Sequence, residues 1–415
     1  MDPLRLQALL GVAFFPLLLW SLSLNRQKFP LRLGLWTLGF QFVTAAILLK
    51  TPPGALFFKG CDGLSDHFTQ IAVQAARVVF GPLADAESLE HAFGRGHTFI
   101  FAIWVGALIT VISALVSLLN HWNVLPKLVE SLARALRFSL GVSGSESMNA
   151  AANIFFGHTE SVLVIKAYVD TLTKSELLSI QTLGMATLSL GAIPVYSKLG
   201  DGAGHIMTAT VLSVLGGLWC SKILLPETQQ SPTRAGANLS PPRGAKSTVE
   251  AVCVGAEQGL FLALSVFAML LAFTALIAVV NHLLLWVQTC GGVASPRKME
   301  SLVGVLHVPI AWLMGIPAQE CLEIGELLGQ RVVLNEFFGY LGLSELRQTL
   351  SPRAFTLATY ALSGFANPAS VGMLAAAISN AAPNRLSEAA SLGARAMLGG
   401  LCTSYLTTAV AGVIL

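Results

Sequence analysis

The sequence is poor in charged residues, which make up 11% of its 415 positions, whereas hydrophobic residues make up 54%. A soluble chain of this length carries about 25% charged residues, because its surface faces water. The mean hydropathy of +0.69 points the same way. Most of the surface therefore faces lipid. The composition predicts a polytopic membrane protein and excludes a soluble enzyme, a nucleic-acid binder or a disordered scaffold.

The chain also lacks several motifs that are typical of metal sites, phosphate-binding sites and disulfide frameworks. The six cysteines form no C-x-x-C pair and most lie in apolar runs, so buried thiols are expected rather than a disulfide or metal framework. The chain has no H-E-x-x-H motif, no glycine-rich phosphate loop and no aspartate after Asp201. A net charge of +3 is too small to indicate a polyanionic partner. No cofactor is expected, and the first apolar run lacks an A-x-A cleavage site, which favours a retained span over a signal peptide.

Eight apolar runs are predicted to cross the bilayer, which takes about 20 residues, although several of these runs are shorter. They are 9–24, 33–49, 98–119, 177–197, 206–221, 259–280, 354–379 and 396–415.

Basic residues fall in connections that share one side if these spans alternate. They are Arg26, Lys28 and Arg32, then Arg234, Arg243 and Lys246, then Arg385 and Arg395. The positive-inside rule makes that side cytoplasmic and puts both termini outside. Segment 51–96, with five acids, then lies outside, and the spacing of Phe68, Ile71 and Val78 predicts a helix along the membrane surface.

Two further apolar stretches, 143–165 and 302–338, carry carboxylates. These include Glu146 and Glu160 in the first, and Glu320, Glu323, Glu326 and Glu336 in the second. A carboxylate facing lipid at mid-bilayer costs at least about 2.5 kcal/mol. Re-entrant helical hairpins buried inside the protein would reconcile these charges with the apolar composition.

Each stretch precedes a span interrupted by polar and small residues, at 185–191 and at 363–370, and then a plainer span. On the predicted topology the two units are inverted, and paired broken helices of this kind indicate the central site of a transporter. The alternative is two unrelated kinked helices. The pattern divides the chain into a scaffold with an interfacial helix (1–120), a first repeat (121–225), a cytoplasmic loop with the sixth span (226–300) and a second repeat (301–415).

At these residues the sequence resembles a known family. Gly141-Val-Ser-Gly-Ser-Glu-Ser-Met-Asn-Ala-Ala-Ala-Asn-Ile-Phe-Phe-Gly-His-Thr-Glu160 is similar to the signature of concentrative nucleoside transporters, and Asn335-Glu-Phe337 and Gly364-Phe-Ala-Asn367 match later parts of it. The likeness covers nearly the whole chain, without the N-terminal extension of longer members. It implies a homotrimer of all-α subunits with eight spans, two re-entrant hairpins, and a transport subdomain that slides past a scaffold to import nucleosides.

The resemblance also assigns site residues. The substrate group is His158, Thr159, Glu160, Ala192, Glu336, Phe365, Asn367 and Ser370, and the sodium group is the side chains of Asn153 and Thr187 with the carbonyls of Phe156 and Leu188. Carboxylate and amide groups suit ribose hydroxyls and base edges. The alternatives are a structural pairing of Glu336 with Arg331 or Arg353, and a capping role for Asn153.

Two departures from the family pattern bear on specificity. His158 stands where glutamine is common, and Pro368 follows Asn367 where phenylalanine is usual. A neutral imidazole offers one donor and one acceptor on a rigid ring, so base preference is expected to differ, and modified nucleosides are possible substrates. Sodium is the favoured coupling ion, with a proton as the alternative. An intramembrane enzyme and a passive channel are rivals from other classes, and no enzymatic activity is expected.

Overall fold

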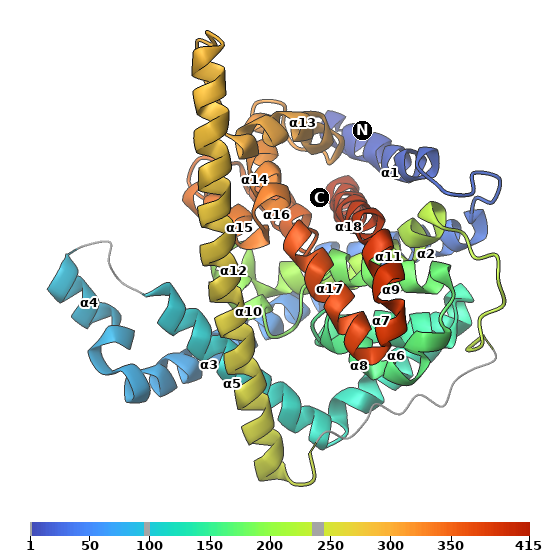
Figure 1. The fold of residues 1–415 in the computed structure, drawn as a ribbon, viewed down its shortest axis with the longest axis horizontal. Helices are drawn as coiled ribbons and strands as arrows, with labels where there is room; N and C mark the ends of the chain where they lie inside the picture. The colour runs from blue at the N-terminus through green and yellow to red at the C-terminus, as the bar shows by residue number, and fades with distance from the viewer. Residues whose placement is uncertain (1, 95–99, 235–244) are drawn as a thin grey trace.

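The computed structural model describes residues 2–94, 100–234 and 245–415, and every regular element within them is a helix (Figure 1). Two predicted positions, Thr98 at the start of the third span and Arg243 in the basic loop, lie outside these residues. The all-helical prediction is confirmed for the described chain.

Among the described residues, 6 helices are long and apolar enough to cross a membrane, and each overlaps one predicted span. They are α1 (Pro3–Ser21), α2 (Leu31–Lys50), α5 (Phe101–His121), α11 (Gly202–Leu224), α12 (Thr248–Cys290) and α18 (Leu386–Ile414). The two other predicted spans are each broken into two helices, as expected. These are α9 (Lys174–Ala186) with α10 (Ile193–Leu199), and α16 (Pro352–Leu362) with α17 (Pro368–Ala381).

The same order of elements occurs twice. The first set is a helix pair joined by a short tip, α7 (Gly144–Phe155) and α8 (Glu160–Val164), then broken α9–α10, then α11. The second set is the pair α14 (Cys321–Val333) and α15 (Glu336–Glu345), then broken α16–α17, then α18. We call these the first and second repeat, and the junctions α7–α8 and α14–α15 the first and second tip.

The predicted second hairpin, 302–338, begins too early in the sequence. It includes most of α13 (Met299–Leu313), a separate helix that packs against α14. The backbone turns between these two helices at Gly315, where φ is +81°, so that α14 starts a new element. The residues around this turn, Met314, Gly315 and Ile316, are apolar, so no polar residue in the sequence marks the end of α13.

The break between α16 and α17 has local causes in the sequence. Asn367 is extended and caps α17, its Oδ1 accepting from the Ser370 amide at 2.9 Å. Pro368 is the first residue of α17, where a missing N–H does no harm and the fixed φ favours a helix start. Gly364 has φ +141°, and a Cβ there would lie 2.9 Å from the Met185 carbonyl oxygen of α9. The two breaks therefore lie against each other.

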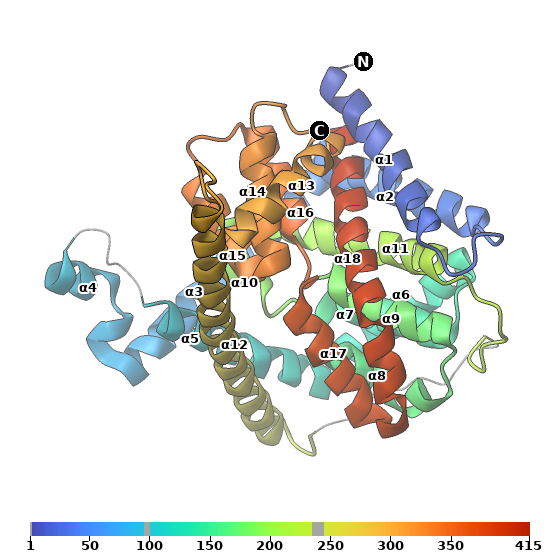
Figure 2. The ribbon, with the colours of Figure 1, turned by 45° about the horizontal axis from the view of Figure 1, so that its top comes forward.

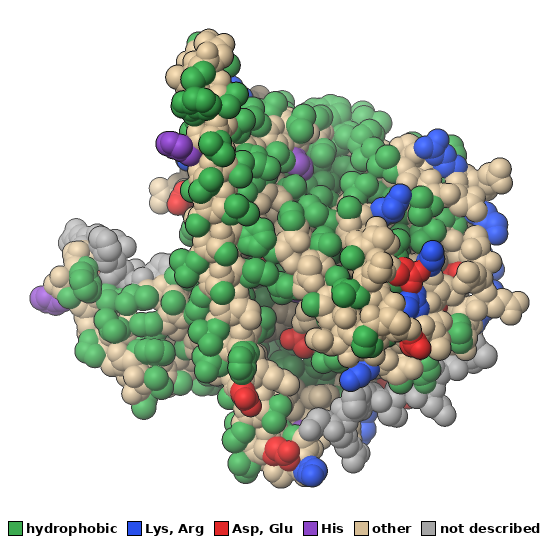
Figure 3. Space-filling model, viewed as in Figure 1, with side chains coloured by type: hydrophobic (Ala, Val, Ile, Leu, Met, Phe, Trp, Pro, Cys, Tyr) green, Lys and Arg blue, Asp and Glu red, His purple; other side chains and the backbone are tan. Residues whose placement is uncertain are grey.

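The 43-residue helix α12 runs along one side of the main helical body, with α3 and α4 lying beyond it (Figures 1 and 2). Its small residues Ala251, Gly255, Gly259 and Ala263 are buried at four-residue spacing. Added Cβ atoms at the two glycines would meet the backbone of α5 within 3 Å, so this stripe lets the two helices approach closely. Most of the remaining surface of α12 is apolar and exposed (Figure 3).

The other elements connect these parts. They are α3 (Pro52–Phe80), η1 (Gly81–Ala84), α4 (Ala86–Phe93), α6 (Val124–Leu140), η2 (Lys166–Thr171) and η3 (Pro383–Arg385). The helix predicted from the spacing of Phe68, Ile71 and Val78 is confirmed, since all three lie within α3. The first and last helices pack together, and the Arg5 guanidinium donates to the Leu415 carbonyl at 3.0 Å, so both ends of the chain lie on one side (Figure 2).

Candidate functional site

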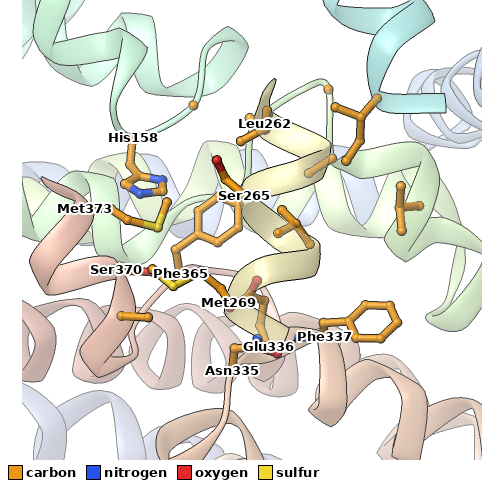
Figure 4. A pocket seen from close by; sticks show the side chains of 18 of the residues that line it. His158, Leu262, Ser265, Met269, Asn335, Glu336, Phe337, Phe365, Ser370 and Met373 are labelled. Atoms are coloured by element: carbon orange, nitrogen blue, oxygen red, sulfur yellow. Dashed lines mark hydrogen bonds between the residues drawn. The ribbon is translucent and has the colours of Figure 1, made fainter. Parts of the chain in front are cut away.

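A cavity of about 140 Å³ lies where the two tips and the two helix breaks converge, with α5 and α12 forming its remaining wall. Figure 4 shows the side chains that face it from these elements. All of the predicted substrate residues line this cavity, namely His158, Thr159, Glu160, Ala192, Glu336, Phe365, Asn367 and Ser370. Residues more than two hundred positions apart in the sequence thus meet at one place.

Glu336 is the first residue of α15 and is only 6% exposed. Its Oε1 accepts from the Tyr196 hydroxyl at 2.8 Å, and its Oε2 accepts from Asn367 Nδ2 at 3.0 Å. Asn335 caps α15 just before it, accepting from two backbone amides. These contacts fix the carboxylate in place, and each of its oxygens keeps a lone pair for a further donor.

The arginine pairing considered for Glu336 is not what the structure shows. Arg331 donates to the carbonyls of Ala361 and Gly364, and Arg353 donates to those of Gly315 and Gly412. Glu336 makes no salt bridge with a described residue. Its buried charge is stabilised by a hydroxyl and an amide, which leaves it available for a ligand.

The first tip presents an imidazole to the cavity. His158 is 7% exposed, and its Nε2 has no hydrogen-bond partner among the described residues. Its ring lies 4.9 Å from that of Phe365, centroid to centroid (Figure 4). Next to it, the Thr159 hydroxyl lies 3.5 Å from Glu160 Oε2. A buried ring nitrogen without a partner is costly unless something binds to it, so it can serve a polar ligand edge.

Other lining residues were not predicted from the sequence. Tyr196 of α10 supplies a donor to Glu336, and Ser113 of α5 and Ser265 of α12 add polar groups to otherwise apolar walls. The signal for Tyr196 was a polar aromatic ring close to Pro194 in a broken span. The two serines lie in long apolar runs and carry no sequence signal, because only packing brings α5 and α12 to the cavity.

The residues predicted to bind sodium lie beside the first helix break. Asn153 and Thr187 are buried, Phe156 caps the end of α7, and Leu188 lies within the break. Asn153 Nδ2 donates to the backbone and side-chain oxygens of Asn149, both at 2.9 Å, which turns its Oδ1 toward the Thr187 hydroxyl oxygen at 3.4 Å. Asn153 lies inside the last turn of α7, so it is not an N-terminal cap.

The Thr187 hydroxyl also lies 2.9 Å from the Leu183 carbonyl, its closer acceptor. When the hydroxyl proton of Thr187 points to the Leu183 carbonyl, a lone pair of the Thr187 hydroxyl oxygen is directed toward Asn153 Oδ1. Both oxygens can then act as ligands. Hard oxygen ligands in this arrangement fit a small monovalent cation.

Glu146 serves the structure of the first repeat. It completes a capping box with Ser143 at the start of α7, and its carboxylate is 2.6 Å from Lys222 Nζ of α11. A second capping box, Thr173 with Glu176, begins α9. These polar pairs stabilise the first turns of α7 and α9, and they lie away from the cavity.

Spanning helices, two broken helices and, between the repeated units, a mainly apolar cavity with a few convergent polar side chains define a multi-pass membrane transporter. Profiles described as "Na+ dependent nucleoside transporter" match at the C-terminus over residues 205–412 and at the N-terminus over 10–83, and "Nucleoside recognition" matches 102–202. The chain belongs to this nucleoside transporter family. Since the family is one of transporters, the expectation of no enzymatic activity is confirmed.

Relatives agree with this assignment over almost the whole chain. The uncharacterized transporter YutK of Bacillus subtilis is 33% identical over 99% of both chains. Nucleoside permease NupC of Helicobacter pylori is 32% identical, covering 98% of this chain and 97% of its own. Sodium/nucleoside cotransporter 1 of Mus musculus is 28% identical over 99% of this chain and 64% of its own length.

Solved structures share the fold. CNTnw in an inward-facing substrate-bound state has a TM-score of 0.91 and 30% identity, covering 99% of this chain and 98% of that chain. A doubly substituted CNTnw in an outward-facing state has a TM-score of 0.92 and 30% identity, covering 100% and 98%. Because this fold occurs in inward-facing and outward-facing states, it supports alternating access.

We predict that His158→Gln changes which nucleosides compete best. An amide has one more donor than neutral imidazole, and one hydrogen bond is worth about 0.5–1.5 kcal/mol, so the ratio of purine to pyrimidine inhibition constants should shift by up to about tenfold. Competition against labelled uridine uptake measures this. His67→Gln, on the exposed face of α3, is the matched control. An unchanged competition profile would show that His158 does not contact the base.

Proposed function

We propose that this protein imports nucleosides by cation-coupled symport, with sodium as the coupling ion. The observation that carries the proposal is the Glu336 carboxylate, held by Tyr196 and Asn367 and facing a cavity that the first tip closes from the other side. Ribose hydroxyls donate strongly to an ionised carboxylate. Such a site suits a neutral, hydroxyl-rich solute, because hydroxyl donors are enough to pair with the carboxylate and no positive charge on the solute is needed.

The two ends of the cavity would contact different parts of the nucleoside. Glu336, Asn367 and Ser370 gather on the second repeat and would hold the ribose. His158, Thr159 and Glu160 project from the first tip and would face the base, with the Phe365 ring as an apolar wall. A flat base has donor and acceptor edges and two apolar faces, which matches this division.

The position of the ion site supports coupling. Asn153 lies on α7, the helix that leads to the first tip, and Thr187 lies where α9 ends. A sodium ion bound between them would tie the first tip to the first break and order both sides of the substrate cavity. Ion binding then lowers the cost of binding nucleoside, which is the physical basis of symport.

The larger arrangement fits an elevator-type movement within a homotrimer in the bacterial inner membrane, with both termini outside. The tips and breaks pack together as one unit, whereas α5 and α12 form a separate pair along the cavity. The apolar outer face of α12 would then contact lipid or neighbouring subunits. The tips would be re-entrant hairpins, reached from opposite sides of the membrane.

Uptake into proteoliposomes tests the proposal. Labelled uridine, adenosine and pseudouridine should accumulate when a sodium gradient is imposed, and replacing sodium with choline should abolish accumulation. Preloading with unlabelled nucleoside should accelerate labelled uptake, as in a carrier and not in a channel. Uptake that ignores choline replacement but collapses with a protonophore would overturn sodium coupling in favour of protons.

A further inference from the structure

The second repeat contains a fully buried arginine where the first repeat has Asn153. Arg331 is 0% exposed and stands two residues before the end of α14, which ends at Val333. Asn153 stands two residues before the end of α7, which ends at Phe155. Each of these helices leads to a tip and packs against the broken helix of its own repeat. The two side chains therefore hold equivalent positions.

The two helix breaks also correspond residue by residue. Thr187 is the C-cap of α9, and its hydroxyl donates to the Leu183 carbonyl four residues earlier at 2.9 Å. Ser363 is the C-cap of α16, and its hydroxyl donates to the Thr359 carbonyl four residues earlier at 2.8 Å. It follows that Gly364, after Ser363, is the counterpart of Leu188, whose carbonyl belongs to the proposed sodium site.

The Arg331 guanidinium occupies this second break. Its Nη2 donates to the Gly364 carbonyl at 3.2 Å and to the Ser404 hydroxyl at 3.0 Å, and its Nη1 donates to the Ala361 carbonyl. No described carboxylate forms a salt bridge with it. The positive charge is stabilised by carbonyl oxygens at the end of α16, where the helix dipole is negative. Arginine stays protonated, so this cation is permanent.

We propose that Arg331 is a tethered cation that takes the place of a coupling ion in the second repeat, so that the protein moves one sodium ion per nucleoside, bound at the first break alone. The inference rests on the sodium coupling proposed above. The carbonyl of Gly364, which would otherwise be a sodium ligand, is already bound by the guanidinium, and a second cation beside it would be repelled. Each transport cycle then carries one net positive charge with an uncharged nucleoside.

The number of sodium ions taken up per nucleoside tests this proposal directly. Wild-type proteoliposomes should take up labelled sodium and labelled uridine in a ratio of about one, and uridine uptake should rise with sodium with a Hill coefficient of about one. A ratio of two with sodium-dependent uptake would overturn this inference and leave sodium coupling standing. Sodium-independent uptake in the wild type would instead overturn the coupling proposal itself.

Variants of Arg331 separate a tethered charge from a merely structural contact. Arg331→Lys keeps a cation and should keep the ratio at one. Arg331→Gln removes the charge and frees a carbonyl, so its ratio and Hill coefficient should both rise toward two. Arg353→Gln is the matched control, because Arg353 also donates to two carbonyls, those of Gly315 and Gly412, away from the break.

Normal uptake by Arg331→Gln with a ratio of one would contradict the proposal. If Arg331→Gln fails to fold, the ratios of sodium to uridine taken up by the wild type and by Arg331→Lys still test the proposal. A ratio of one in both supports the tethered cation, and a ratio of two in either overturns it.

Discussion

Glu336→Gln is expected to reduce nucleoside uptake at least a hundredfold while the protein still folds. The substitution keeps the shape but removes the charge, and charge-assisted hydrogen bonds are worth about 1.5–3 kcal/mol each. Two ribose hydroxyls would lose such a partner, and about 2.8 kcal/mol corresponds to a hundredfold loss of binding. In addition, an amide has one acceptor oxygen, so it cannot accept from both Tyr196 and Asn367 as the carboxylate does.

The measurement is labelled uridine uptake by proteoliposomes containing equal amounts of folded protein, with thermal stability in detergent as the folding check. Glu323→Gln, on the exposed face of α14, removes a carboxylate from the same repeat without touching the cavity and should transport normally. Uptake by Glu336→Gln within a few-fold of wild type would show that the carboxylate does not bind the nucleoside.

Thr187→Val is expected to raise the sodium concentration for half-maximal uptake by about tenfold. Valine has nearly the shape of threonine but lacks the hydroxyl, so one proposed oxygen ligand disappears at a cost of about 1.4 kcal/mol. The same substitution leaves the substrate cavity intact, because Thr187 does not line it. Uridine affinity at saturating sodium should therefore change little.

Thr187→Ser is the matched variant, since it keeps the hydroxyl, and its sodium dependence should stay close to that of the wild type. Uptake measured across a sodium titration, with choline holding ionic strength constant, gives both values. Equal sodium dependence in the wild type and in Thr187→Val would place the ion elsewhere.

Much of the fold could be predicted from the sequence because a membrane imposes a simple length rule on apolar segments. The continuous spans and both broken ones were found in this way. The boundary between α13 and α14 failed because the chain turns within apolar residues, Met314, Gly315 and Ile316, and no polar residue marks the turn. A turn such as the one at Gly315 depends on backbone conformation, which hydropathy does not report.

The composition, periodicity and motif order of the chain are local properties, and they were enough to predict a membrane protein, its repeated order of elements and its family. They also pointed to Glu336 and Asn367, whose polar groups stand out in apolar surroundings. The contacts of these groups became known only from the packing of the folded chain. It joined Tyr196 to Glu336, brought α5 and α12 to the cavity, and turned Arg331 toward the second break rather than toward Glu336. Such partners are set by packing between distant segments, and no spacing in the chain encodes them.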